Sequence, residues 1–83
     1  MIDPVWLEGL TPRVARMLDA ERVRAAERGD GYFGAEHLLE AILEEADSVP
    51  AQLIAELGVT EALREALNDY FARESHRRRQ RNP

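Results

Sequence analysis

At 83 residues, with 45% hydrophobic and 33% charged side chains, the chain has the size and composition of one small globular domain. It has no cysteine, which excludes disulfides and thiolate metal sites, so tight helix packing or self-association is the expected supplement to a limited core. The N-terminal residues lack a basic signal region, and no apolar run approaches the ~18 residues of a membrane span. We therefore expect a soluble, cytoplasmic protein.

The net charge of −5 conceals an asymmetry between the two ends of the chain. Residues 1–74 hold all 16 acidic residues and 7 of the 11 basic ones, which gives −9, whereas residues 75–83 give +4. Such a tail could contact nucleic acid or an acidic partner, or it could neutralise the acidic face of the last helix. The charges of this tail are Arg77, Arg78, Arg79 and Arg81.

The first ten residues are unusually apolar for a chain end. They include the only tryptophan, Trp6, and four aliphatic residues, which argues against a free tail. We expect this segment either to cover one edge of a helical bundle or to contact a second subunit.

A first helix is predicted over residues 12–28. Thr11 is a capping residue and is followed by a proline, which is favoured at the first helical position. Val14 and Leu18 lie on one face at helical spacing. Glu21 falls inside this apolar stripe, so its carboxylate must reach solvent, find an arginine, or lie at an interface.

A glycine-rich stretch, residues 29–34, ends this helix and begins a second one, which we expect to end at Glu45 or Ala46. Two aromatics in the stretch, Tyr32 and Phe33, indicate that it packs against the domain. His37 has no plausible ligand or nucleophile partner nearby in the sequence. We interpret it as a packed, hydrogen-bonded structural histidine.

Two further helices complete the pattern. Ser48 is a good N-cap for a third helix, and Gly58 is placed to terminate it. Thr60 begins a fourth helix, which nothing interrupts before residue 82, so it can extend into the arginine run. The apolar face of this helix is formed by Leu63, Leu67, Tyr70 and Phe71.

Catalytic patterns are absent from the sequence. There is no phosphate-binding glycine loop followed by lysine, no His-Glu-x-x-His pair and no cysteine nucleophile. The only serines, Ser48 and Ser75, lie at a predicted helix end and in the tail. We therefore expect no enzymatic activity, no metal site and no cofactor.

Residues 34–43, Gly-Ala-Glu-His-Leu-Leu-Glu-Ala-Ile-Leu, resemble the Glu-His-Leu-Leu signature of the Clp N-terminal repeat. The resemblance extends upstream to the helix that Thr11 opens and downstream to residues 53–60, and it covers roughly residues 10–72. It is strongest to the N-terminal domain of bacterial ClpC-type unfoldases. The usual domain of that family holds two repeats, whereas this sequence contains one and has no ATPase module.

The resemblance implies an all-α fold, a four-helix single repeat over residues 11–72. Residues 1–10 would then be an apolar segment that packs on the domain, and residues 73–83 a basic extension. Because the family packs two repeats about a pseudo-twofold axis, a lone repeat leaves an apolar surface that a C2 homodimer would cover. The candidate interface residues are Trp6, Glu21, Val23 and Tyr70.

The resemblance also implies a non-catalytic protein-interaction module that binds a Clp-type unfoldase, its adaptors or its substrates, as an adaptor, competitor or decoy. In the bacterial branch the domain binds phosphoarginine, and the matching positions are Thr11 for the phosphate and Glu36 for the guanidinium. This sequence has Ala35 where the family often has threonine. The alternative is that Thr11 and Glu36 are ordinary capping residues. A second alternative is a small dimeric regulator whose arginine tail binds nucleic acid in a salt-sensitive way.

Overall fold

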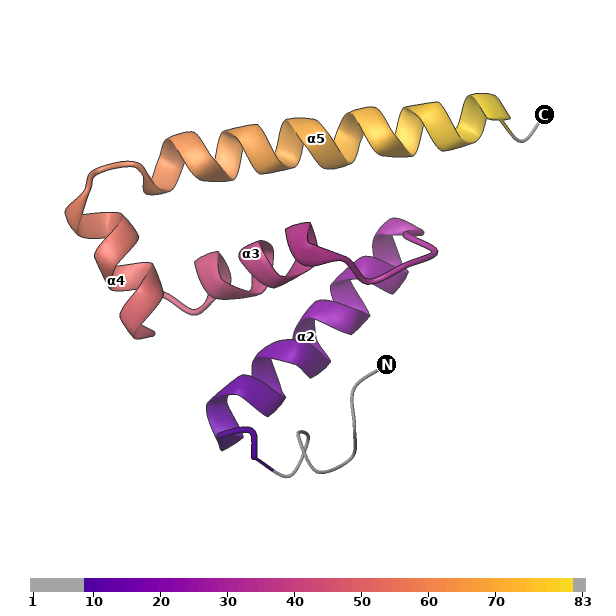
Figure 1. Ribbon diagram of the computed structural model, residues 1–83. Coiled ribbons are helices and arrows are strands. Elements are labelled where there is room, and N and C mark those ends of the chain that lie inside the picture. The colour runs from indigo at the N-terminus through magenta and orange to yellow at the C-terminus, as the bar shows by residue number, and fades with distance from the viewer. Residues whose placement is uncertain (1–8, 82–83) are drawn as a thin grey trace.

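The computed structural model describes the backbone of residues 9–81 and the side chains of residues 9–75. This part of the chain is all-helical and contains no strand. The helices are α2 (Pro12–Arg28), α3 (Ala35–Glu44), α4 (Val49–Glu56) and α5 (Thr60–Arg81). In Figure 1, α3 lies between α2 and α5, and α4 connects the far end of α3 to α5. The predicted all-α, four-helix architecture is confirmed.

The ends of α2 follow from local sequence. Thr11 has an extended backbone, and its Oγ1 accepts a hydrogen bond from the Val14 N–H at 3.2 Å, which satisfies one free donor of the first turn. The helix ends at Gly29, whose φ of 85° lies in the left-handed region that favours glycine. The predicted range of this helix is therefore confirmed at both ends.

The second helix, α3, ends at Glu44, slightly earlier than the sequence predicts. The Glu45 carbonyl accepts bonds from the Ser48 N–H at 3.0 Å and from the Ser48 hydroxyl at 2.7 Å, so the chain turns here instead of continuing the helix. The Ser48 Oγ also accepts from the Ala51 N–H at 3.4 Å and caps α4. Gly58, with φ 75°, lies just beyond the end of α4, as predicted.

The last helix, α5, has 22 residues and a length of about 33 Å. It continues without a break across residues 72 and 73 and into the arginine run, as the absence of a breaker predicts. The side chains of Arg77, Arg78, Arg79 and Arg81 lie outside the described side chains. None of the helices in the described part of the chain is long and apolar enough to cross a membrane.

The apolar core is small and lies where α3, α4 and α5 meet. Its buried centre is Leu43, Leu67 and Phe71, and four half-buried residues pack around it: Leu39, Ile54, Leu63 and Tyr70. Several large apolar side chains stay exposed around this core, among them Val23, Leu38 and Val49. Much apolar surface on the helices is therefore left uncovered.

Candidate functional site

His37 is a structural residue at the turn between α2 and α3, as predicted. Its side chain is fully buried, and its Nδ1 accepts a hydrogen bond from the Gly34 N–H at 2.8 Å. This bond leaves the ring proton on Nε2, which lies 2.8 Å from Oδ2 of Asp30 and donates to it. The rings of Tyr32 and Phe33 pack on the imidazole, with centroids 5.0 and 5.3 Å away. The histidine therefore fixes the glycine-rich turn.

Arg28, at the end of α2, connects three parts of the fold. Its two terminal nitrogens donate to the two carboxylate oxygens of Glu40 at 2.9 and 3.2 Å, and its Nε donates to Asp30 at 3.0 Å. The guanidinium also lies 3.7 Å from the centroid of the Phe71 ring on α5. Burial acts to lower the pKa of Arg28, but the hydrogen bonds to Glu40 and Asp30 outweigh it and raise that pKa, so the arginine stays charged. One side chain thus holds α2, the turn, α3 and α5 together.

Glu21 lies beside this arginine and is fully buried. Its Oε1 accepts from Nη1 of Arg24 at 2.5 Å, so of the three environments that the sequence allows, the structure selects the pairing with an arginine. Burial, together with the neighbouring Glu40 carboxylate, raises the pKa of Glu21 to about 7. Burial also acts to raise the pKa of Glu40, but the neighbouring Glu21 carboxyl and the hydrogen bonds from Arg28 outweigh it and hold that pKa below its usual value.

Thr11 and Glu36, the expected phosphoarginine residues, lie at opposite ends of the α2–α3 pair. Arg13, near the start of α2, contacts Glu45, just past the end of α3, at 3.3 Å. Glu36 is in the first turn of α3, roughly 15 Å away along the 10 residues of that helix. The structure therefore does not bring Thr11 and Glu36 together within one chain.

Glu36 lies at the wall of a shallow groove of about 290 Å³ between α3 and α5. Its side chain is half-buried, and its Oε1 lies 3.7 Å from Nδ1 of His37. Among the described residues, no arginine pairs with Glu36. The rest of the groove wall is apolar or aromatic: Leu39, Leu63, Ala66, Leu67 and Tyr70.

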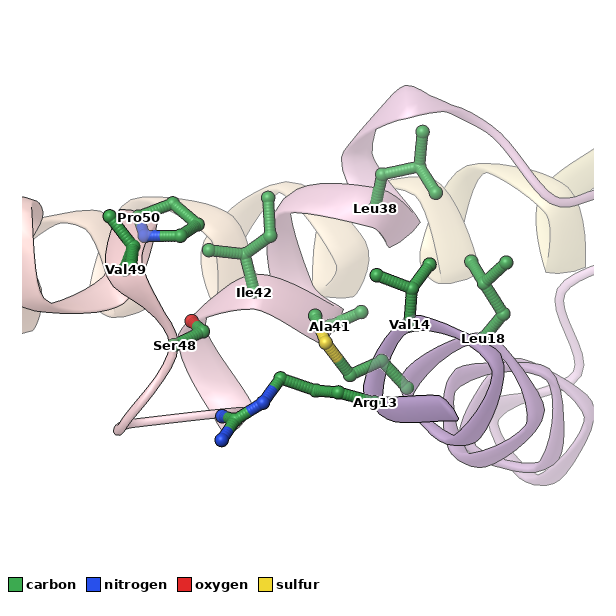
Figure 2. A pocket seen from close by; sticks show the side chains of 10 residues that line it. Arg13, Val14, Leu18, Leu38, Ala41, Ile42, Ser48, Val49 and Pro50 are labelled. Carbon is green, nitrogen blue, oxygen red and sulfur yellow. The ribbon is translucent and has the colours of Figure 1, made fainter. Parts of the chain in front are cut away.

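A second, larger groove of about 490 Å³ runs between α2, α3 and the start of α4 (Figure 2). Its wall is almost wholly apolar, with Arg13 at one end, where it pairs with Glu45 and Asp47. Leu38 and Val49 on this wall are 46% and 70% exposed. The sequence pattern marks these residues as apolar faces of separate helices but does not place them in one groove. The full wall is Arg13, Val14, Met17, Leu18, Leu38, Ala41, Ile42, Ser48, Val49 and Pro50.

The four candidate interface residues have different environments. Val23 is 58% exposed on α2, and Tyr70 is half-buried against the core. Glu21 is buried inside the chain, so its carboxylate does not reach the surface. Trp6 lies outside the described residues. No group of three metal-ligating side chains gathers in the described part of the chain.

Comparison with known proteins identifies the family. The family model described as the Clp repeat (R) N-terminal domain matches residues 9–83. The chain is 40% identical over 48 residues to the chloroplastic chaperone protein ClpC of Pisum sativum, and this match covers 58% of the chain and 5% of that protein. It is equally similar to the chloroplastic ClpA homolog of Brassica napus, an ATP-binding subunit of an ATP-dependent Clp protease, with 6% of that protein covered.

No solved structure matches the chain significantly. The chain spans only about a twentieth of the length of these curated relatives. The family model nevertheless matches most of the length of this chain, and the four-helix fold agrees with the predicted repeat. The chain therefore belongs to the Clp repeat (R) N-terminal domain family.

Proposed function

We propose that the chain is a non-catalytic protein-interaction module that binds segments of Clp substrates, adaptors or unfoldases. The observation that carries this proposal is the environment of Glu36. Glu40, Glu44 and Glu45 on or just past the same helix each pair with an arginine of the chain, whereas Glu36 faces a groove and pairs with no arginine among residues 9–75. An arginine side chain from another protein can therefore use this carboxylate.

The geometry of the groove fits the side chain of arginine or phosphoarginine. The guanidinium would form charge-assisted hydrogen bonds to the Glu36 carboxylate, and the methylene groups would pack on Leu39 and Tyr70. Thr11 is too far along the helix pair to reach the phosphate of the same ligand. If Thr11 takes part in phosphate binding, it has to come from a second copy of the chain.

The test is a titration with free phosphoarginine, and separately with free arginine, followed by residue-resolved amide NMR. We expect shifts around Glu36 and Tyr70 that disappear in Glu36→Ala. The matched control is Glu27→Ala, which removes an exposed glutamate of α2 and leaves the groove intact. Absence of shifts at millimolar concentrations of both ligands would refute binding at Glu36. Phosphoarginine shifts that also reach Thr11, and weaken on dilution, would indicate a site shared between two copies.

We further propose that two copies associate through the apolar groove between α2, α3 and α4. The exposed apolar residues include Leu38 and Val49 on the groove wall. A second copy packed on this face would remove these side chains from water. A C2 arrangement presents the same groove on both subunits, so one surface covers the other.

Analytical ultracentrifugation of two aspartate variants distinguishes the possible dimer surfaces. Leu38→Asp places a charge in the groove, and Val23→Asp places one on an exposed part of α2 outside it. We expect the unmodified chain to sediment as a dimer, Leu38→Asp as a folded monomer, and Val23→Asp as a dimer. A monomeric unmodified chain at high concentration, or dissociation by Val23→Asp alone, would refute association through the groove.

A further inference from the structure

The buried carboxyl groups of Glu21 and Glu40 are not used by either proposed binding surface. We propose that Glu21 stays protonated in the folded chain and donates a hydrogen bond to Glu40, so that the pair forms a proton-dependent latch between α2 and α3. Loss of this proton would place two adjacent carboxylates in the interior and loosen the contact between the two helices.

The first support is the hydrogen bonding of Glu21. Its Oε1 accepts from Arg24, but its Oε2 is buried and has no partner among the described residues. Nη2 of Arg28 is 4.0 Å from this oxygen, beyond hydrogen-bond length. A buried carboxylate oxygen without a donor is costly, and a proton on that oxygen removes the cost.

The second support is Glu40, whose carboxylate can accept a hydrogen bond from the protonated Glu21. Arg28 is committed to both oxygens of Glu40, and this pairing keeps Glu40 ionised. An ionised carboxylate beside a protonated one forms a short, charge-assisted hydrogen bond. The charged groups that act on the pair are Arg24 and Arg28 from α2, and Asp30 contacts Arg28. From α5, the uncharged Phe71 ring lies against the Arg28 guanidinium.

The electrostatics agree with this geometry and determine the direction of the pH effect. The pKa of Glu21 is about 7 in the folded chain and 4.5 in the unfolded chain. The stability from this proton is fully present below pH 4.5. Between pH 4.5 and 7 only the folded state holds the proton, so this stability falls as the pH rises and is lost above pH 7. The difference between these values limits the loss to about 300-fold in the ratio of folded to unfolded chains.

The latch adjoins the apolar groove. Leu18, one turn before Glu21 on α2, and Ala41, next to Glu40 on α3, both line it. A change in the separation of α2 and α3 would therefore change the width of the groove. This consequence rests on the proposed function of the groove, whereas the protonation of Glu21 does not.

The test is a pH titration of the side-chain carboxyl carbons by ¹³C NMR, together with urea unfolding at pH values from 4.5 to 8. We expect the Glu21 carbon to titrate near neutral pH. We expect the ratio of folded to unfolded chains to fall by at least 10-fold between pH 5 and pH 8. Glu21→Gln, which donates an amide N–H to Glu40 at every pH, should remove most of this fall.

The matched control is Glu27→Gln, an exposed position on the same helix, which should keep the pH dependence of the unmodified chain. Titration of the Glu21 carbon below pH 5 would overturn the proposal. So would an equal fall in stability in the unmodified chain and in Glu21→Gln. If Glu21→Gln does not fold, the carbon titration of the unmodified chain decides the question alone. Neither readout depends on phosphoarginine, so failure of ligand binding at Glu36 leaves this test unaffected.

Discussion

Replacement of Arg28 by alanine should destabilise the chain more than any other single loss of a charged side chain. The substitution removes the fork that holds Glu40, the bond from Nε to Asp30 and the contact with Phe71. The carboxylates of Glu40 and Asp30 are 9% and 1% exposed, so both would lose a main cationic partner inside the protein.

The magnitude can be worked from this geometry. Removing one member of a buried ion pair costs about 3–5 kcal/mol, because the remaining charge stays buried without compensation. A chain of 83 residues has a total free energy of unfolding of about 4–12 kcal/mol. Arg28→Ala should therefore remove a large part of the total stability and unfold much of the population at 37 °C.

Urea unfolding followed by circular dichroism at 25 °C and pH 6 measures this change. Arg28→Lys keeps the charge but loses the planar fork, and we expect about 1–3 kcal/mol for it. The control is Arg22→Ala, because Arg22 pairs with Asp19 at 2.9 Å but both side chains are 72% exposed, so we expect at most about 0.5 kcal/mol. If Arg28→Ala costs less than about 1 kcal/mol, or no more than Arg22→Ala, the central role of Arg28 is wrong.

Three further outcomes are expected. Leu43→Ala, at a core position 3% exposed, should cost about 2–4 kcal/mol and lower the melting temperature in calorimetry by 10 °C or more; a drop under 3 °C would contradict the assigned core. Gly29→Ala should cost about 1–2 kcal/mol in urea unfolding because of its φ of 85°, whereas Gly31→Ala, which has open space and no positive φ, should cost less than about 0.5 kcal/mol; equal costs would refute the explanation by backbone strain. Removal of residues 76–83 should leave the NMR response at Glu36 unchanged, and loss of that response together with strong salt dependence would favour the arginine tail as the binding element.

The helix ends could be predicted from the sequence because their causes are local. Thr11 caps α2 through an amide three residues away, and Gly29 supplies the left-handed conformation that ends this helix. Ser48 works in the same way for α4. The end of α3 was predicted one or two residues too late, because the capture of the Glu45 carbonyl by Ser48 depends on a turn geometry that residue preferences do not determine.

The sites were less predictable because they depend on how the helices pack. The pattern of α2 shows that Glu21 interrupts an apolar stripe, but not that Glu40 and Arg28 lie beside it. Resemblance to the family assigns Thr11 and Glu36 to one ligand, yet the structure separates them by roughly the length of α3. Both facts are long-range consequences of the packing of α3 against α2, and a single sequence contains no direct signal of that packing.

The buried charges fix the position of α2, which the small apolar core does not fix. Leu43, Leu67 and Phe71 hold α3 on α5, and none of the described residues of this core belongs to α2. The fork of Arg28 donates two hydrogen bonds to the Glu40 carboxylate, so it fixes the position of α2 against α3. A protein with few core residues gains specificity in this way, and the cost is a stability that depends on the ionisation of groups inside it. The pH response that we assign to Glu21 is therefore a consequence of how this repeat holds its first two helices together.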